Sequence, residues 1–122
     1  MAETVEFASN GSVASGYLVK PSGGSGPGVL VIQEWWGLDS GIKTMADRLG
    51  AGGFVALVPD LYHGALAGHD EMDKASQLMR SLPPKRAGRD MSAAVDFLAG
   101  CSAVTSEGIG VFLKKTLHQA KD

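Results

Sequence analysis

Residues 29–37, VLVIQEWWG, place four apolar residues directly before a polar and aromatic cluster. Val29–Ile32 shows no alternation of apolar and polar residues, which is typical of a strand covered on both faces in a parallel sheet. Phe54–Val58 has the same character. It ends at Pro59-Asp60, because proline has no backbone N–H to donate to a neighbouring strand. We predict that the two segments are neighbouring parallel strands at the centre of one sheet.

The segment between these strands is predicted to be the helix of the crossover. Asp39 and Ser40 are residue types that cap helix N-termini, and glycines at 50, 52 and 53 suit its end. Apolar residues recur within it at helical spacing: Ile42, Met45, Ala46 and Leu49. A helix of this length permits a right-handed crossover between the strands.

An opening hairpin precedes this unit. Thr4–Phe7 and Val13–Lys20 flank Asn10-Gly11, the strongest short hairpin signal, so we expect two antiparallel strands. Turn residues at 21–28 (PSGGSGPG) then lead into the first buried strand. These glycines do not form a phosphate cradle, because such a site needs glycines after a strand and at the opening of a helix.

Beyond the second strand, the apolar spacing predicts two further helices. Asp70 is placed to cap the first, whose apolar residues run from Met72 to Leu82, and Pro84 suits the first turn of the second. Ile109–Val111 is predicted to be a short strand and Phe112–Ala120 a closing helix. Strands that alternate with helices indicate an α/β fold, which we assign to a single domain over all 122 residues.

Composition and charge exclude several classes of partner. The net charge is −2, so the chain lacks the clustered cations that a nucleic-acid site needs. The longest apolar runs are about five residues, too short to span a membrane, and the acidic start, MAETVEF, is unlike a basic secretory signal. With a single cysteine there is no internal disulfide, and we expect a cytoplasmic protein.

Chemistry in an open α/β sheet is expected beyond the carboxyl ends of its strands, which places it at Gln33–Gly37 and Pro59–Gly64. Glu34 follows the first buried strand directly, and it is either a solvated surface charge or a carboxylate held for chemistry. The adjacent Trp35 and Trp36 either pack as core residues or form the wall of an apolar cleft beside that carboxylate.

The second segment carries Tyr62 and His63, which we expect to line the cleft together with Trp36. A metal site there would use the histidines and aspartates of residues 60–70, but their spacing matches no tight ligand pattern, so we expect no metal and no cofactor. Cys101 follows a predicted helix rather than sitting on a strand-to-helix turn between glycines, which favours a bystander thiol over a nucleophile.

The chain resembles the dienelactone hydrolase family over about residues 3 to 111. The resemblance lies in VLVIQEWWGL (29–38), IKTMADRLGAGGFVALVPDLYHG (42–64), LMRSL (78–82) and AAVDFLAG (93–100). It implies an α/β-hydrolase-like three-layer sandwich, with a mostly parallel sheet after the N-terminal antiparallel hairpin. It also implies hydrolysis of a small-molecule ester or lactone by a cysteine (or serine) nucleophile on a G-x-C-x-G elbow, acting with a histidine and an aspartate.

Matched residue by residue, Glu34 is the family's glutamate that contacts the nucleophile, and Trp35 provides a backbone N–H to the oxyanion hole. The family pattern would continue from residues 108–111 (GIGV) directly into the elbow, but this chain continues with FLKKTLH, which resembles the family's closing helix. The elbow, the acid and the catalytic histidine are not recognisable, and His118 does not match that histidine. We therefore expect an incomplete fold: an internal deletion, a spliced or incompletely recorded chain, or a deliberate fragment.

Two principal functions follow. The first is a dienelactone-hydrolase-like enzyme, with activity by this chain alone in doubt because acyl transfer needs a nucleophile, a base and an orienting acid. The alternative is a non-catalytic truncated remnant that acts in oligomerisation or partner binding, with self-association through an exposed sheet edge. A flavodoxin-like binding module is a third, weaker possibility, which the position of the glycines before the strand opposes.

Overall fold

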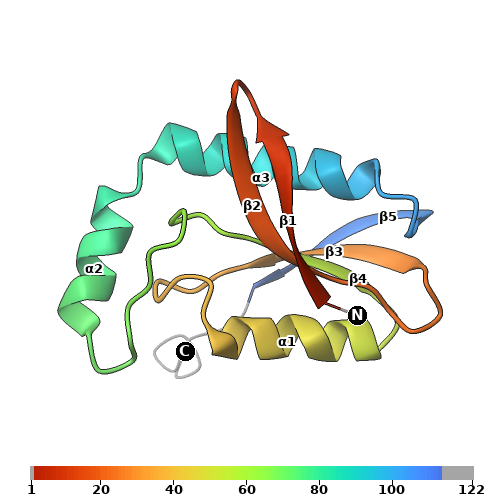
Figure 1. Cartoon of the computed structure of the whole chain (residues 1–122), viewed down its shortest axis with the longest axis horizontal. Helices are drawn as coiled ribbons and strands as arrows, with labels where there is room; N and C mark the ends of the chain where they lie inside the picture. The colour runs from red at the N-terminus through yellow and green to blue at the C-terminus, as the bar shows by residue number, and fades with distance from the viewer. Residues whose placement is uncertain (1, 114–122) are drawn as a thin grey trace.

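The computed structural model describes residues 2–113, apart from the side chains at 106–108, 112 and 113. It contains a five-stranded sheet in the order β1-β2-β4-β3-β5, with three helices (Figure 1). The elements are β1 (Ala2–Ser9), β2 (Ser12–Val19), β3 (Gly26–Ile32), α1 (Ser40–Ala51), β4 (Val55–Pro59), α2 (Met72–Ser81), α3 (Pro84–Ala99) and β5 (Val104–Leu113). No helix among the described residues is long and apolar enough to cross a membrane.

The predicted opening hairpin is confirmed. β1 and β2 pair antiparallel along their whole length, from Ala2 opposite Val19 to Ser9 opposite Ser12. Asn10 and Gly11 form the two-residue turn, both with positive φ, at 46° and 90°. These are the backbone angles for which an Asn-Gly pair is suited, and they match the twist of the flanking strands.

The central parallel pair is also confirmed. β3 and β4 run parallel, with Gly28 opposite Val55 and Leu30 opposite Leu57. All five residues of β4 are buried, because β4 has β2 on one side, β3 on the other and helices over both faces. This explains why the sequence of β4 lacks alternation.

Helices cover both faces of the sheet, which makes three layers as the resemblance implied (Figure 1). On one face, α1 packs its buried residues Ile42 and Ala46 against the sheet residues Val19, Val29, Val31, Ala56 and Val58. On the other face, α3 packs Ala94 and Leu98 against Phe7, Leu18, Leu30, Val55 and Leu57. Alternate strand residues therefore supply two separate apolar cores.

The helix boundaries correct one prediction. Asp39 caps α1, since its Oδ1 accepts the N–H of Ile42 at 3.1 Å, and α3 begins at Pro84 as expected. Asp70 does not cap α2; the residue before Met72 is Glu71, and its carboxylate accepts the N–H of Gly68 at 2.8 Å instead. The acidic side chain nearest the helix start, Glu71, thus makes a local loop contact, and no side chain among the described residues caps α2.

Most of the apolar stripe of α2 is exposed or only partly buried. Of its apolar stripe only Ala75 is buried, while Met72 and Met79 are 59% and 53% exposed. The helical spacing predicted the helix correctly, and much of its apolar stripe is left uncovered by the other described residues.

The last strand is longer than predicted. β5 pairs with β3 in parallel from Gly28 opposite Ile109 to Ile32 opposite Leu113. The expectation that a helix begins at Phe112 is wrong, because the ladder with β3 continues through Phe112 and Leu113. The rest of the predicted helix, including His118, lies outside the described residues.

The central position of β4 can be tested by truncating one of its side chains. Leu57→Ala should lower the free energy of unfolding by about 3 kcal/mol. Leu57 is fully buried beneath α3, and the truncation leaves a cavity that the helix does not move to fill. Val13→Ala, at a position 64% exposed beside the hairpin turn, should change it by less than about 0.5 kcal/mol. Urea titration followed by circular dichroism measures both, and equal effects would contradict the central position of β4.

Candidate functional site

Two chain segments meet at the carboxyl ends of β3 and β4. The first follows β3 and leads into α1; the second follows β4 and leads into α2. Gln33, buried at the end of β3, joins them, since its Oε1 accepts the N–H of Leu61 at 3.0 Å. A second link is the N–H of Ala67, which donates to the carbonyl of Trp36 at 3.0 Å. The parallel pairing therefore brings both predicted site segments side by side.

The first segment turns sharply between Glu34 and Gly37. The N–H of Gly37 donates to the carbonyl of Glu34 at 3.1 Å, and φ at Gly37 is 100°. A Cβ at this position would lie 2.7 Å from the carbonyl oxygen of Ala65, in the other segment. Only glycine fits this turn, because both the backbone angle and the close approach exclude a side chain.

Glu34, Trp35 and Trp36 are all half-buried at this turn. The two indole rings lie 5.2 Å apart between centroids with a tilt of 59°. The carboxylate thus sits at the end of a buried strand beside two aromatic rings, as the sequence predicted.

Tyr62 and His63 lie at very different depths. Tyr62 is 8% exposed and packs beneath the turn, where its Cδ2 would be 3.2 Å from a Cβ at Gly37. Burial raises the pKa of the Tyr62 hydroxyl above its ordinary value. His63 is more open and has a positive φ of 51°, unusual for a residue with a side chain.

A buried carboxyl group holds His63 in this conformation. The Nε2 of His63 lies 2.7 Å from Oδ2 of Asp90, a residue of α3 that is 2% exposed. The hydroxyl of Ser9, at the end of β1, donates to Oδ1 of Asp90 at 2.7 Å. One carboxyl group therefore connects the hairpin, α3 and the second segment.

Asp60 and Arg86 complete the attachment of the second segment. Oδ2 of Asp60 accepts the N–H of Gly64 at 2.8 Å, and the guanidinium of Arg86 donates to the carbonyl of Leu61 at 3.2 Å. Oδ1 of Asp60 and Nε of Arg86 are buried, and neither has a hydrogen-bond partner among residues 2–113. One polar atom with unfilled hydrogen-bonding capacity thus lies in the second segment, at Asp60, and the other lies on α3, at Arg86, whose guanidinium contacts that segment.

His69 is held separately from His63. Its Nε2 lies 3.0 Å from Oδ2 of Asp39, the residue that caps α1, and its ring stacks on Trp36 at 4.4 Å between centroids. The two histidines therefore have different acidic partners. In the part of the chain that the structure describes, no three histidine, cysteine or acidic side chains are arranged to hold a metal ion.

Sequence reasoning missed the residues that position the site. Asp90 and Ser9 are 81 residues apart, and His63 and Asp90 are 27 apart, so no local motif joins them. Asp90 nevertheless occupies a position on the buried face of α3 in line with Ala87 and Ala94. An acidic residue within an apolar helical stripe is a sign of a buried hydrogen-bond network.

The comparisons with known proteins bear on this arrangement directly. The sequence model of the dienelactone hydrolase family matches residues 14–112. The chain belongs to that family. Among solved structures, m3DLH superimposes with a TM-score of 0.75 at 28% identity, covering 93% of this chain and 48% of that one. A dienelactone-hydrolase-like promiscuous phosphotriesterase from metagenomic libraries, P91, gives a TM-score of 0.70 at 25% identity, with 93% and 48% covered.

The sequence relatives, like the solved structures, are about twice as long as the part that this chain matches. Protein usf of Aquifex pyrophilus is 42% identical over 117 residues, which are 91% of this chain and 49% of the relative. A protein of Aquifex aeolicus, provisionally named a carboxymethylenebutenolidase, is 39% identical over the same shares. This dienelactone hydrolase family chain therefore spans about half the length of the curated relatives it matches, and its α/β-hydrolase-like domain is partial.

Removal of Asp90 should release the second segment. Asp90→Ala should lower the free energy of unfolding by about 3 kcal/mol, because Ser9 and His63 lose their shared partner inside the protein. Ser9→Ala should lower it by about 1 kcal/mol, since one hydrogen bond is lost. Asp96→Ala, at an exposed position of the same helix, is the matched control and should have little effect in urea titration. A loss for Asp90→Ala no larger than for the control would show that the network does not hold the fold.

Proposed function

We propose that this chain supplies half of the active site of a hydrolase that cleaves a small-molecule ester or lactone. The register at the edge of the sheet carries the proposal. Leu113 of β5 lies opposite Ile32 of β3. Ile32 is two residues before Glu34 in the sequence. In the family that this chain resembles, the nucleophile elbow follows the strand that matches residues 108–111. An elbow in that position would follow directly beside the turn that carries Glu34.

The proposed chemistry is acyl transfer in two steps. A cysteine thiolate, or a serine alkoxide, attacks the carbonyl carbon of the substrate, and the backbone N–H of Trp35 donates to the oxyanion that forms. The carbon–oxygen bond to the leaving alcohol then breaks, and a histidine gives that alcohol its proton. Water then attacks the acyl-enzyme and gives a proton to the histidine, the bond between the acyl carbon and the nucleophile breaks to release the acid, and the histidine returns the proton to the nucleophile. Glu34 contacts the resting nucleophile and sets its ionisation.

Trp36, Tyr62 and His63 are proposed to line the substrate cleft. Their placement supports this role in different ways: the half-buried indole of Trp36 is at the surface of the turn, and Tyr62 forms the floor beneath Gly37. The contact between His63 and Asp90 would fix the orientation of the His63 ring in this role. The hydrogen bond from Leu61 to Gln33 keeps the two sides of this cleft at a fixed separation.

The role of Glu34 can be tested in a chimaera in which residues 2–113 replace the matching half of the Aquifex pyrophilus relative. Glu34→Gln should lower turnover of a phenyl ester by about 100-fold, because the neutral amide no longer sets the ionisation of the nucleophile. The thermal midpoint should shift by less than about 2 °C. Glu6→Gln, on the exposed side of β1, should change neither quantity. Normal turnover with a large drop in midpoint would show that Glu34 is structural.

The 122-residue chain itself is the second control for this experiment. It should show no nucleophile-dependent hydrolysis, since a partial oxyanion hole accelerates little without a nucleophile and base. Cys101 packs against the core beside α3, so Cys101→Ala should leave this background rate unchanged. Burst-phase acylation that disappears in Cys101→Ala would overturn the assignment of half an active site.

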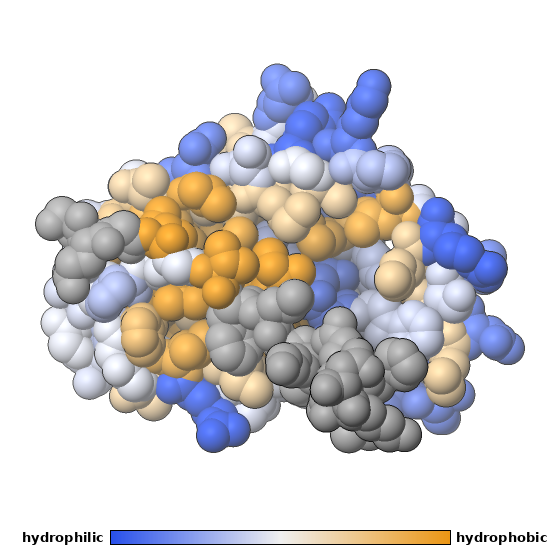
Figure 2. All heavy atoms as spheres, turned by 180° about the vertical axis from the view of Figure 1, so that it is seen from behind, coloured by the Kyte–Doolittle hydropathy of each residue, from blue (hydrophilic) through white to orange (hydrophobic). Residues whose placement is uncertain are grey.

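A second candidate function is self-association through the sheet edge formed by β5. This strand is the last in the sheet order, so one side of its backbone has no neighbouring strand among the described residues. Val111 is 68% exposed on it. β5 lies at the back of the molecule in Figure 1, and Figure 2 shows apolar side chains gathered on that face. Long apolar edge strands promote pairing between chains.

A charge on β5 should weaken such pairing. Val111→Lys should shift the chain toward monomer in analytical ultracentrifugation, because a lysine on an edge strand opposes strand pairing. Val13→Lys introduces the same charge at a similarly exposed valine at the hairpin turn and should leave the distribution unchanged. A wild-type chain that is monomeric at all concentrations, or equal effects of the two substitutions, would rule out this edge as the interface.

A further inference from the structure

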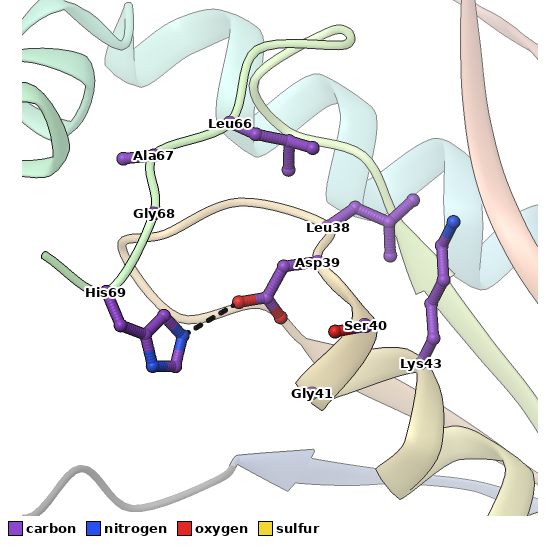
Figure 3. A pocket seen from close by; sticks show the side chains of 9 residues that line it. All are labelled: Leu38, Asp39, Ser40, Gly41, Lys43, Leu66, Ala67, Gly68 and His69. Carbon is purple, nitrogen blue, oxygen red and sulfur yellow. Dashed lines mark hydrogen bonds and ion pairs between the residues drawn. The ribbon is translucent and has the colours of Figure 1, made fainter. Parts of the chain in front are cut away.

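An open groove lies next to the candidate site, between the start of α1 and the segment before α2 (Figure 3). Its volume is about 600 Å3, within the range of small-molecule sites. Two short stretches line it, residues 38–43 without Ile42 and residues 66–69. None of these residues was assigned a part in the proposed chemistry, so the groove is an additional feature of this face.

The walls of the groove are largely apolar. Leu38, Leu66 and Ala67 are among the residues that line it, and Figure 3 shows the side chains of Leu38 and Leu66 on the side of Lys43, with Ala67 pointing away from them. Leu66 is 45% exposed, which leaves much of a large apolar side chain in contact with water. Such a side chain in a concave site favours the burial of an apolar group against it.

Leu66 also connects the groove to the candidate active site. Its Cδ2 would lie 3.0 Å from a Cβ at Gly37, so the leucine packs directly on the turn that begins at Glu34. The stacking of His69 on Trp36 makes a second connection. A ligand whose reacting bond lies near Glu34 could therefore extend into the groove without leaving the surface.

The charged groups of the groove already have partners. Asp39 uses one oxygen for the N–H of Ile42 and the other for His69. Nζ of Lys43 lies 5.4 Å from the centre of the Tyr17 ring. Figure 3 shows His69 and Lys43 on opposite sides of the two leucines. Because Asp39, His69 and Lys43 are engaged in these contacts, the apolar wall at Leu38 and Leu66 suits an uncharged apolar group.

We propose that this groove binds the apolar, non-reacting part of the substrate, an aryl or short alkyl group attached to the ester or lactone. This inference rests on the proposed function and specifies the substrate class: esters with a substantial hydrocarbon group are preferred over esters of the smallest alcohols. Because an added methylene in an apolar pocket changes affinity by roughly tenfold or more, a phenyl group should be distinguished from a methyl group.

The test uses equilibrium binding to the 122-residue chain, labelled at the methyl groups of leucine and the indole N–H of tryptophan for NMR. Phenyl acetate should cause saturable shifts of the Leu38 and Leu66 methyl signals and of the Trp36 indole. Methyl acetate at the same concentrations should cause none. Leu66→Ala should weaken phenyl acetate binding about tenfold, because it removes most of one wall. Met79→Ala, at an exposed methionine of α2, should leave it unchanged.

Three results would overturn the groove assignment: no shift with phenyl acetate, shifts confined to residues outside the groove, or equal binding by Leu66→Ala and Met79→Ala. None of these results affects the hydrolysis by the chimaera, which depends on the nucleophile and on Glu34. Conversely, groove binding by the chain together with an inactive chimaera would overturn the proposed hydrolysis alone.

Discussion

The parallel pairing of β3 and β4 is the constraint on which the rest of the structure depends. It fixes two carboxyl ends at one edge of the sheet, so the segments that follow must share the same small space. The side chain of Gln33 binds the segment after β4. Gly37 has no side chain, which allows the same segment to approach closely. A shift of register between the strands would break both contacts, since each joins residues near a strand end.

The segment after β4 has little regular structure, so its shape comes from side chains that reach it from elsewhere. Asp90 and Arg86, both on α3, hold His63 and the carbonyl of Leu61. Such contacts hold a loop firmly only while every partner remains, because a buried polar group that loses its partner destabilises the fold. Because Asp90 and Arg86 both belong to α3, the position of the segment after β4 depends on how α3 packs on the sheet.

Most of this fold can be predicted from local pattern, and the exceptions have physical causes. The hairpin at Asn10-Gly11 and the two buried strands follow from turn chemistry and uninterrupted apolar runs, which act over a few residues. The spacing of Leu113, Leu117 and Ala120 predicts a helix that includes Phe112 and Leu113, whereas the ladder of these two residues with β3 depends on residues about 80 positions away. The Ser9–Asp90–His63 network could not be predicted from the sequence for the same reason, because its members meet only after the chain has folded.

The open edge of the sheet is formed by β5, whose composition is unusual for an edge strand. Residues 104–113, VTSEGIGVFL, carry a single charge at Glu107 and contain neither lysine nor proline. Edge strands usually carry such residues to prevent pairing with other chains, whereas strands inside a sheet do not need them. The composition of β5 is therefore that of an interior strand, although it has a neighbour on one side only among the described residues. The same strand ends opposite Ile32, two residues before Glu34 in the chain, so a strand that paired along its open side would lie one strand further from that turn.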